Sequence, residues 1–124
     1  MALSLVETYG GRRRDHSAAE AEILWLLSEA GFEIYGRESP KAEVMLRGEA
    51  SGEFAARTGE LVSARVVILL EARERREDRI LAVARRGHTA VDLSAELAAS
   101  RAFQEAAAAI TPDFLELLAD RWNE

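Results

Sequence analysis

Three strand patterns follow one another between residues 43 and 93: VMLRGEASGEF (44–54), LVSARVVILLEAR (61–73) and RILAVARRGHTAV (79–91). Apolar and polar residues alternate in each pattern, as expected of strands that bury one face of a sheet. Short polar segments separate them, and Gly59 suits a hairpin turn that needs a positive φ. This stretch therefore predicts a three-stranded antiparallel meander.

The pattern over 61–73 is predicted to be the centre of the sheet. Its middle is apolar on both faces, because Ile68 and Leu70 alternate with Val67 and Leu69. Such a strand is covered on both sides, or one of its sides meets a partner. Three predicted helices are available to cover a small sheet, so we favour a helix over Val67 and Leu69, with a partner surface as the alternative.

A helix is predicted before the meander. Ser17 followed by Glu20 fits a capping box, and Gly31 suits the left-handed position that ends a helix. The helix should therefore run from 17 to about 30. Short strands are expected on either side of it, over residues 3–9 and 32–35.

Two helices are predicted after the meander. The first should span 95–110, with Leu97 and Phe103 on its apolar face. Thr111 and Pro112 then suit the N-cap and first turn of a second helix over 112–122. Within the strands, the glycines at 48, 52 and 87 are expected to mark bulges or bends.

Together these elements predict a single domain over residues 1–124 with an α/β (α+β) fold. We expect a two-layer sandwich, in which helices 17–30 and 95–110 pack on one face of a mostly antiparallel sheet of four or five strands. Helix 112–122 is expected at an edge or on a neighbouring molecule. A chain of 124 residues is long enough to bury a core without disulfides, and this one has no cysteine.

Charge and hydropathy narrow the class of partner. The net charge is −6, and residues 92–124 hold seven acidic groups against two basic ones, so we expect no nucleic-acid partner. The apolar runs are far shorter than the roughly twenty residues of a membrane span, so we expect no membrane insertion by this chain. The N-terminal residues lack a signal-peptide pattern. We expect a periplasmic or envelope-associated protein if a leader has been removed, and a cytoplasmic one otherwise.

No catalytic or cofactor motif is recognised in the sequence. It has neither a P-loop nor a strand–GxGxxG–helix pattern, and its two histidines, His16 and His88, fall in different elements. Ser63, His88 and Asp92 could be drawn as a triad, but no nucleophile elbow surrounds the serine. We therefore expect no cofactor, no metal, no small-molecule substrate and no enzymatic activity.

Eight residues are candidates for contact with a partner. The arginine runs are predicted to lie in a loop and a hairpin turn, where they are either solvated or meet an anionic partner. The apolar members lie on the second strand of the meander and at the end of the last helix. The candidates are Arg12, Arg13, Arg14, Val67, Leu69, Arg75, Arg76 and Trp122.

The order of elements resembles a family. A helix ending in Gly31-Phe32 is followed by a strand that starts Ala42-Glu43, then by the meander and an alanine-rich helix over 95–110. The matching residues are Gly31, Phe32, Ala42, Glu43, Val44, Leu46, Gly48 and 64–70. On these the chain is similar, over about 17–110, to the α/β domain of bacterial cell-envelope assembly proteins. They include the curli secretion channel periplasmic domain, lipoprotein activators of penicillin-binding proteins, flagellar assembly protein T and the N-terminal domain of the Tol translocation protein.

The resemblance implies a non-enzymatic protein-interaction module of a cell-envelope assembly, associated with a lipoprotein or the outer membrane. It supplies no catalytic residues. The alternative is a soluble cytoplasmic oligomerisation or regulatory domain, in which Val67 and Leu69 or the terminal helix form a homodimer interface. The predicted partner is thus another protein or a second copy of this chain.

Overall fold

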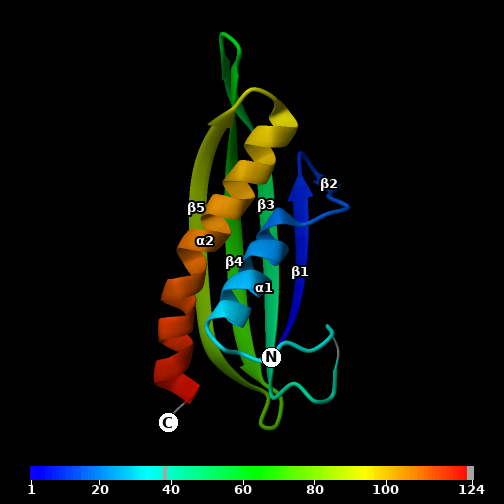
Figure 1. Cartoon of the computed structure of the whole chain (residues 1–124), viewed down its shortest axis with the longest axis vertical. Helices are drawn as coiled ribbons and strands as arrows, with labels where there is room; N and C mark the ends of the chain where they lie inside the picture. Colours follow the sequence, from blue (N-terminus) through cyan, green and yellow to red (C-terminus); the bar gives the residue numbers. More distant parts are fainter. Residues whose placement is uncertain (38, 123–124) are drawn as a thin grey trace.

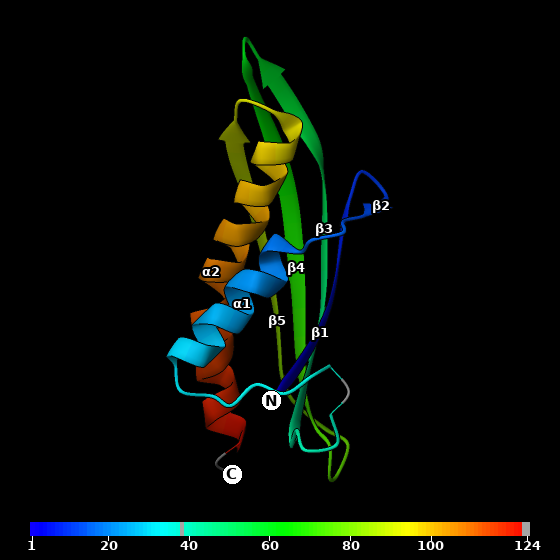
Figure 2. The same ribbon diagram turned by 45° about the vertical axis from the view of Figure 1, so that its right-hand side comes forward.

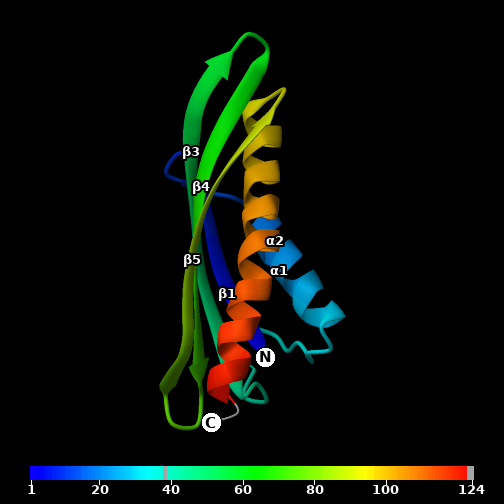
Figure 3. The ribbon, with the colours of Figure 1, turned by 90° about the vertical axis from the view of Figure 1, so that its left-hand side faces the viewer.

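The computed structural model describes residues 1–37 and 39–122. In this part of the chain a five-stranded sheet carries two helices on one of its faces (Figures 1 and 3). The elements are β1 (Ala2–Tyr9), β2 (Arg12–Arg13), α1 (Ala18–Glu29), β3 (Val44–Thr58), β4 (Leu61–Glu74), β5 (Arg79–Asp92) and α2 (Ala95–Trp122). Strands lie in the order β2-β1-β3-β4-β5, and every pair is antiparallel except β1 with β3. The predicted two-layer, mostly antiparallel α/β sandwich is confirmed.

The core lies between the sheet and α2. Alternate residues of β4 point at the helix, and all of them are buried: Val62, Ala64, Val66, Ile68, Leu70 and Ala72. The helix packs against them with a stripe of small residues and one large ring: Ala98, Ala99, Ala102, Phe103, Ala106 and Ala107. The alanine side chains are short, and α2 runs beside one face of the sheet (Figure 3).

The meander forms as predicted, but its surroundings differ in two ways. The central strand is β3 rather than β4, because β1 adds in parallel beyond β3. Both helices cover the face of Ile68 and Leu70, so the prediction of a helix over Val67 and Leu69 is wrong. The β3–β4 hairpin, closed at Gly59, extends beyond the first turn of α2 (Figure 2).

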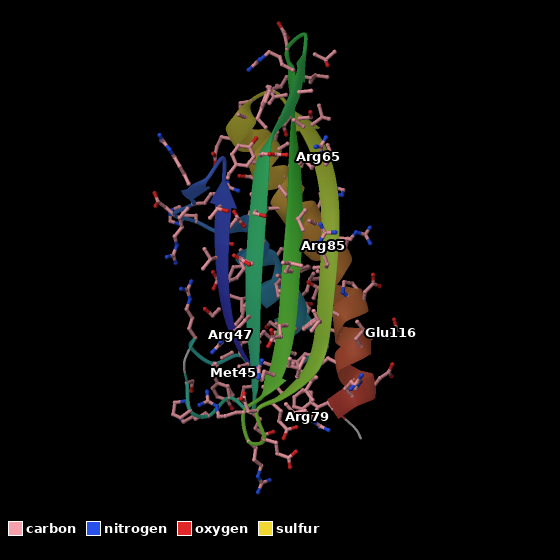
Figure 4. All side chains as sticks on the ribbon, turned by 180° about the vertical axis from the view of Figure 1, so that it is seen from behind. Met45, Arg47, Arg65, Arg79, Arg85 and Glu116 are labelled. Atoms are coloured by element: carbon pink, nitrogen blue, oxygen red, sulfur yellow. The ribbon has the colours of Figure 1, made fainter. Side chains whose placement is uncertain are left out.

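The two predicted C-terminal helices are one. Pro112 lies inside α2, and Thr111 is not an N-cap: its hydroxyl donates to the carbonyl of Ala107 at 2.7 Å. The buried stripe continues past the proline through Phe114 and Leu118, so packing on the sheet outweighs the backbone hydrogen bond that proline removes. Residues 112–122 therefore continue α2, and this end of the helix lies beside the edge strand β5 (Figure 4), as predicted.

The α1 helix begins and ends as predicted, but no strand follows it. Phe32 N–H donates to the carbonyl of Leu27 and Gly31 N–H to that of Ser28, which is a Schellman motif. The backbone of Phe32 is therefore used to end the helix. Of the predicted 32–35 strand, only Tyr35 pairs, in an isolated bridge with Ala2.

Bulges do not occur at the predicted glycines. The register shifts instead between Phe54 and Ala56, and opposite the step from Ala72 to Arg73. Leu97, predicted to lie on the apolar face of its helix, is 52% exposed.

Gly52 is needed for close packing. A Cβ built there would lie 2.7 Å from Val66 Cγ1 and 3.1 Å from Phe103 Cζ. We expect Gly52→Ala to lower the free energy of unfolding by about 1–3 kcal/mol, because it overpacks the core. Urea denaturation measures this. Gly87→Ala is the control, since its Cβ would meet only the carbonyl of Val66, at 3.8 Å; equal losses for the two variants would contradict the prediction.

Candidate interaction surface

The side of the sheet that faces away from the helices is uncovered in the described chain. We call it the outer face; Figure 4 looks onto it, with Met45, Arg47, Arg65 and Arg85 labelled. Cross-strand pairing places Val6, Glu49, Leu69 and Arg85 side by side on four successive strands. Both apolar members of this row are exposed, Leu69 by 41% and Val6 by 38%.

Charges on the outer face are only partly paired. Arg73 contacts Glu71 at 3.0 Å, and Arg65 lies 3.9 Å from Glu53. No described carboxylate forms an ion pair with Arg47 or Arg85. The face therefore combines exposed apolar side chains with arginines that form no ion pair with a described carboxylate. The predicted contacts Val67, which is half-buried, and Leu69 both lie on it.

Three other predicted contacts meet at the end of the molecule that holds the β4–β5 turn. Arg75, Arg76 and Trp122 line a cleft of about 710 Å³. Arg75 serves the fold, because its guanidinium donates to the carbonyls of Ala42 at 2.9 Å and Ser39 at 2.8 Å. Arg76 is exposed like Arg75, but no described residue forms an ion pair with it.

Trp122 closes this end of the core. Its ring stacks on Phe32, with ring centroids 6.4 Å apart and planes 9° apart. The side chain is half-buried, and it joins the last turn of α2 to the segment after α1. Packing accounts for its position.

The arginines of the first loop are separated by the structure. Arg12 and Arg13 are exposed in β2. Arg14 turns inward: its guanidinium donates to Glu7 at 2.8 Å and to Glu96 at 2.8 Å, and it lies 5.3 Å from the centre of the Phe103 ring. Arg14 therefore links β1 to α2, and its guanidinium is occupied by contacts within the chain.

Glu7 is the residue that sequence reasoning missed. Its carboxylate is buried and accepts hydrogen bonds from Arg14, from the Ser17 hydroxyl at 2.8 Å, and from the N–H groups of Ala18 at 3.3 Å and Ala19 at 2.9 Å. It thus places negative charge at the positive end of α1. The signal was present in the alternation of the first strand, where the residue falls on the inward-facing side.

A second polar cluster joins α2 to β5. Glu105 lies 3.2 Å from His88 Nε2 and 3.0 Å from Arg101 Nε. Hydrogen bonds from Arg101 and then His88 lower the pKa of the Glu105 carboxyl, so it stays ionised between two donors. Ser63 is on the outer face, where its hydroxyl contacts the carbonyl of Ala56 at 3.4 Å, while His88 is on the helix side. The residues drawn as a triad are therefore not brought together.

The described residues hold neither a metal-binding cluster nor a membrane-spanning helix. No group of three or more His, Asp or Glu side chains within 1–37 and 39–122 is placed to hold a metal ion. In the same part of the chain, neither helix has an apolar stretch long enough to cross a membrane.

Comparison with known proteins supports the fold. No protein-family model and no curated protein matches the chain. A predicted lipoprotein of Caulobacter crescentus is similar, with a TM-score of 0.59 at 15% identity, over 95% of this chain and 90% of that one. A minor lipoprotein of Acinetobacter baumannii gives 0.58 at 18%, over 91% and 89%. A Xanthomonas campestris protein of the family DUF330 gives 0.56 at 12%, over 98% and 86%.

These structural similarities support part of the resemblance seen in the sequence. At such identities they show a shared fold, and two of the three proteins are described as lipoproteins. None of the three is described as a member of the specific families named from the sequence. The chain therefore has the fold of bacterial proteins that include lipoproteins.

Proposed function

We propose that this chain is a non-enzymatic protein-interaction module of a bacterial cell-envelope assembly, associated with a lipoprotein or the outer membrane. The observation that carries the proposal is the uncovered outer face. The fold shared with lipoproteins supports the compartment. The same fold over nearly the whole length of each compared protein supports a module that works as one unit.

The composition of the outer face suits a protein partner. An antiparallel sheet with one solvated face normally alternates apolar residues inward with polar residues outward. Here Leu69 and Val6 break that alternation, and Val83, on β5 opposite Glu71, is 59% exposed. Arginine is enriched at protein interfaces, and Arg47 and Arg85 flank these apolar residues.

The experiment is affinity capture from detergent-solubilised membranes of the source bacterium, with Leu69→Glu and Leu97→Glu compared to the unchanged protein. Both leucines are exposed, on the outer face and on α2 respectively. Substitution of exposed residues usually changes stability by no more than about 0.5 kcal/mol, so both variants should stay folded. We expect the amount of captured partner to fall at least tenfold with Leu69→Glu and to stay within twofold of the unchanged protein with Leu97→Glu.

Two outcomes would contradict the proposal. One is that no protein is enriched over the bead control. The other is that both variants capture as much as the unchanged protein. Light scattering addresses the alternative function: a homodimer that dissociates in Leu69→Glu, with no other protein captured, would support an oligomerisation domain instead.

A further inference from the structure

We infer that the free edge of β5 takes up an extended acidic segment of a protein partner as a sixth strand of the sheet. This inference rests on the proposed function and names the chemistry of the partner. It stands on the direction of the backbone groups of β5, on the side chains along its edge and on their charge.

The backbone of β5 is open on one side. Arg101 of α2 donates to the carbonyl of Val91 at 3.2 Å, so this carbonyl points away from β4. Backbone groups alternate in direction along an antiparallel strand, so the N–H and C=O of Thr89, Gly87 and Arg85 point outward as well. No described residue forms a backbone hydrogen bond with these three on that side.

The opposite edge of the sheet is occupied at the two ends of β1. β2 pairs with the end of β1, Arg14 N–H donates to the carbonyl of Glu7, and Tyr35 N–H donates to that of Met1. An incoming strand therefore has a long run of free groups at β5. Addition of a strand to such an edge is a common mode of peptide recognition.

Side chains along the β5 edge define what a sixth strand should carry. Gly87 pairs with Val67, and a Cβ built on the glycine would meet only a carbonyl at 3.8 Å. The flank of Val67 is therefore reachable from the edge over Gly87. Arg85, two residues away on the same face, is exposed beside Leu69 and forms no ion pair with a described residue. An apolar side chain opposite Gly87 and an acidic one opposite Arg85 fit this edge.

Charge favours a different protein over a second copy of this chain. Arg85 and Arg86 lie in the middle of the edge and are both exposed. Two β5 strands paired antiparallel about this point would set arginine against arginine, which is unfavourable for directly opposed residues. On the α2 side, Arg101 contacts Glu105 at 3.0 Å and offsets its charge, which reduces the repulsion of an acidic segment there.

The test is NMR titration of the ¹⁵N-labelled chain with a blocked heptapeptide of threonine and valine that carries phenylalanine third and glutamate fifth. In the antiparallel direction, these two side chains fall opposite Gly87 and Arg85. We expect saturable amide shifts over residues 83–91. Thr89→Pro removes one outward N–H and should weaken binding at least tenfold, whereas Thr89→Ala, which keeps it, should stay within twofold. No saturable shift with the unchanged chain would overturn the inference.

Charge reversal keeps the inference testable if the proline disturbs the fold. Arg85→Glu should weaken binding at least fivefold, and a peptide with lysine fifth should restore it. Arg47→Glu, a reversal on the same face away from the edge, should stay within twofold. Equal losses for both reversals would mean general attraction of an acidic peptide to the outer face and would overturn strand addition.

Failure of this inference is distinguishable from failure of the proposed function. If the chain captures a membrane partner and Thr89→Pro captures the same amount, the edge inference is wrong while the function stands. If nothing is captured but the peptide still binds between 83 and 91, the edge is a strand acceptor and the envelope role is wrong.

Discussion

Replacing Glu7 with alanine is expected to lower the free energy of unfolding by about 3–5 kcal/mol, the range for removing one partner of a buried ion pair. The substitution leaves the Arg14 guanidinium, whose side chain is 12% exposed, without its buried carboxylate partner. It also leaves the N–H groups of Ala18 and Ala19 without their acceptor in the first turn of α1. Urea denaturation followed by circular dichroism measures the loss.

The matched control removes the other carboxylate that holds the same arginine. Glu96 also lies 2.8 Å from Arg14, but its side chain is 77% exposed. An exposed ion pair contributes at most about 1 kcal/mol, so Glu96→Ala should cost no more than that. Glu7→Gln should fall between the two, because the amide keeps the size of the side chain and one acceptor oxygen. A loss for Glu7→Ala as small as that for Glu96→Ala would show that burial does not matter here.

Much of the fold could be predicted because its signals are local. Period-two alternation over long segments defines β3, β4 and β5, and it does not depend on what packs against them. Ser17 and Gly31 mark the ends of α1 through hydrogen bonds between near neighbours, and the structure shows those bonds: the Ser17 hydroxyl accepts from Glu20 N–H at 3.0 Å.

The remaining features depend on contacts distant in sequence. Pairing of β1 with β3 decides which strand is central, and the local pattern of either strand carries no information about it. Pro112 is read as a helix start because local propensity favours it there, yet the buried stripe through Phe114 keeps the helix continuous. The face that the helices cover is likewise decided by the whole sheet.

The candidate contacts also depend on both local sequence and distant contacts. Residue type alone cannot separate an arginine that is exposed, such as Arg12, from one used inside the fold, such as Arg14. Trp122 is predicted as a contact because it lies on the terminal helix, but its ring packs on Phe32. The apolar middle of their strand predicts Val67 and Leu69 as contacts, and both lie on the outer face.

Phe103→Ala is expected to lower the free energy of unfolding by about 3–5 kcal/mol, the usual cost of removing a buried aromatic ring. The ring is fully buried among alanines of α2, so few neighbours are large enough to fill the space. It also lies under the guanidinium of Arg14, at 5.3 Å, and its loss removes that contact. Urea denaturation measures the change, and a loss below about 1 kcal/mol would contradict the packing described.

A double-mutant cycle makes this prediction specific to the contact with Gly52. The Cβ of Gly52→Ala would meet Phe103 Cζ at 3.1 Å, so it should be better tolerated once the ring is removed. We expect the two losses to be non-additive. The double variant should lose less free energy of unfolding than the sum of the two single losses, by at least about 0.5 kcal/mol. The contact of the new Cβ with Val66 remains in the double variant, which limits the recovery. Gly87→Ala, which does not touch the ring, should be additive with Phe103→Ala within about 0.5 kcal/mol. Additivity in both cycles would mean that the absence of a side chain at Gly52 is not what admits the ring.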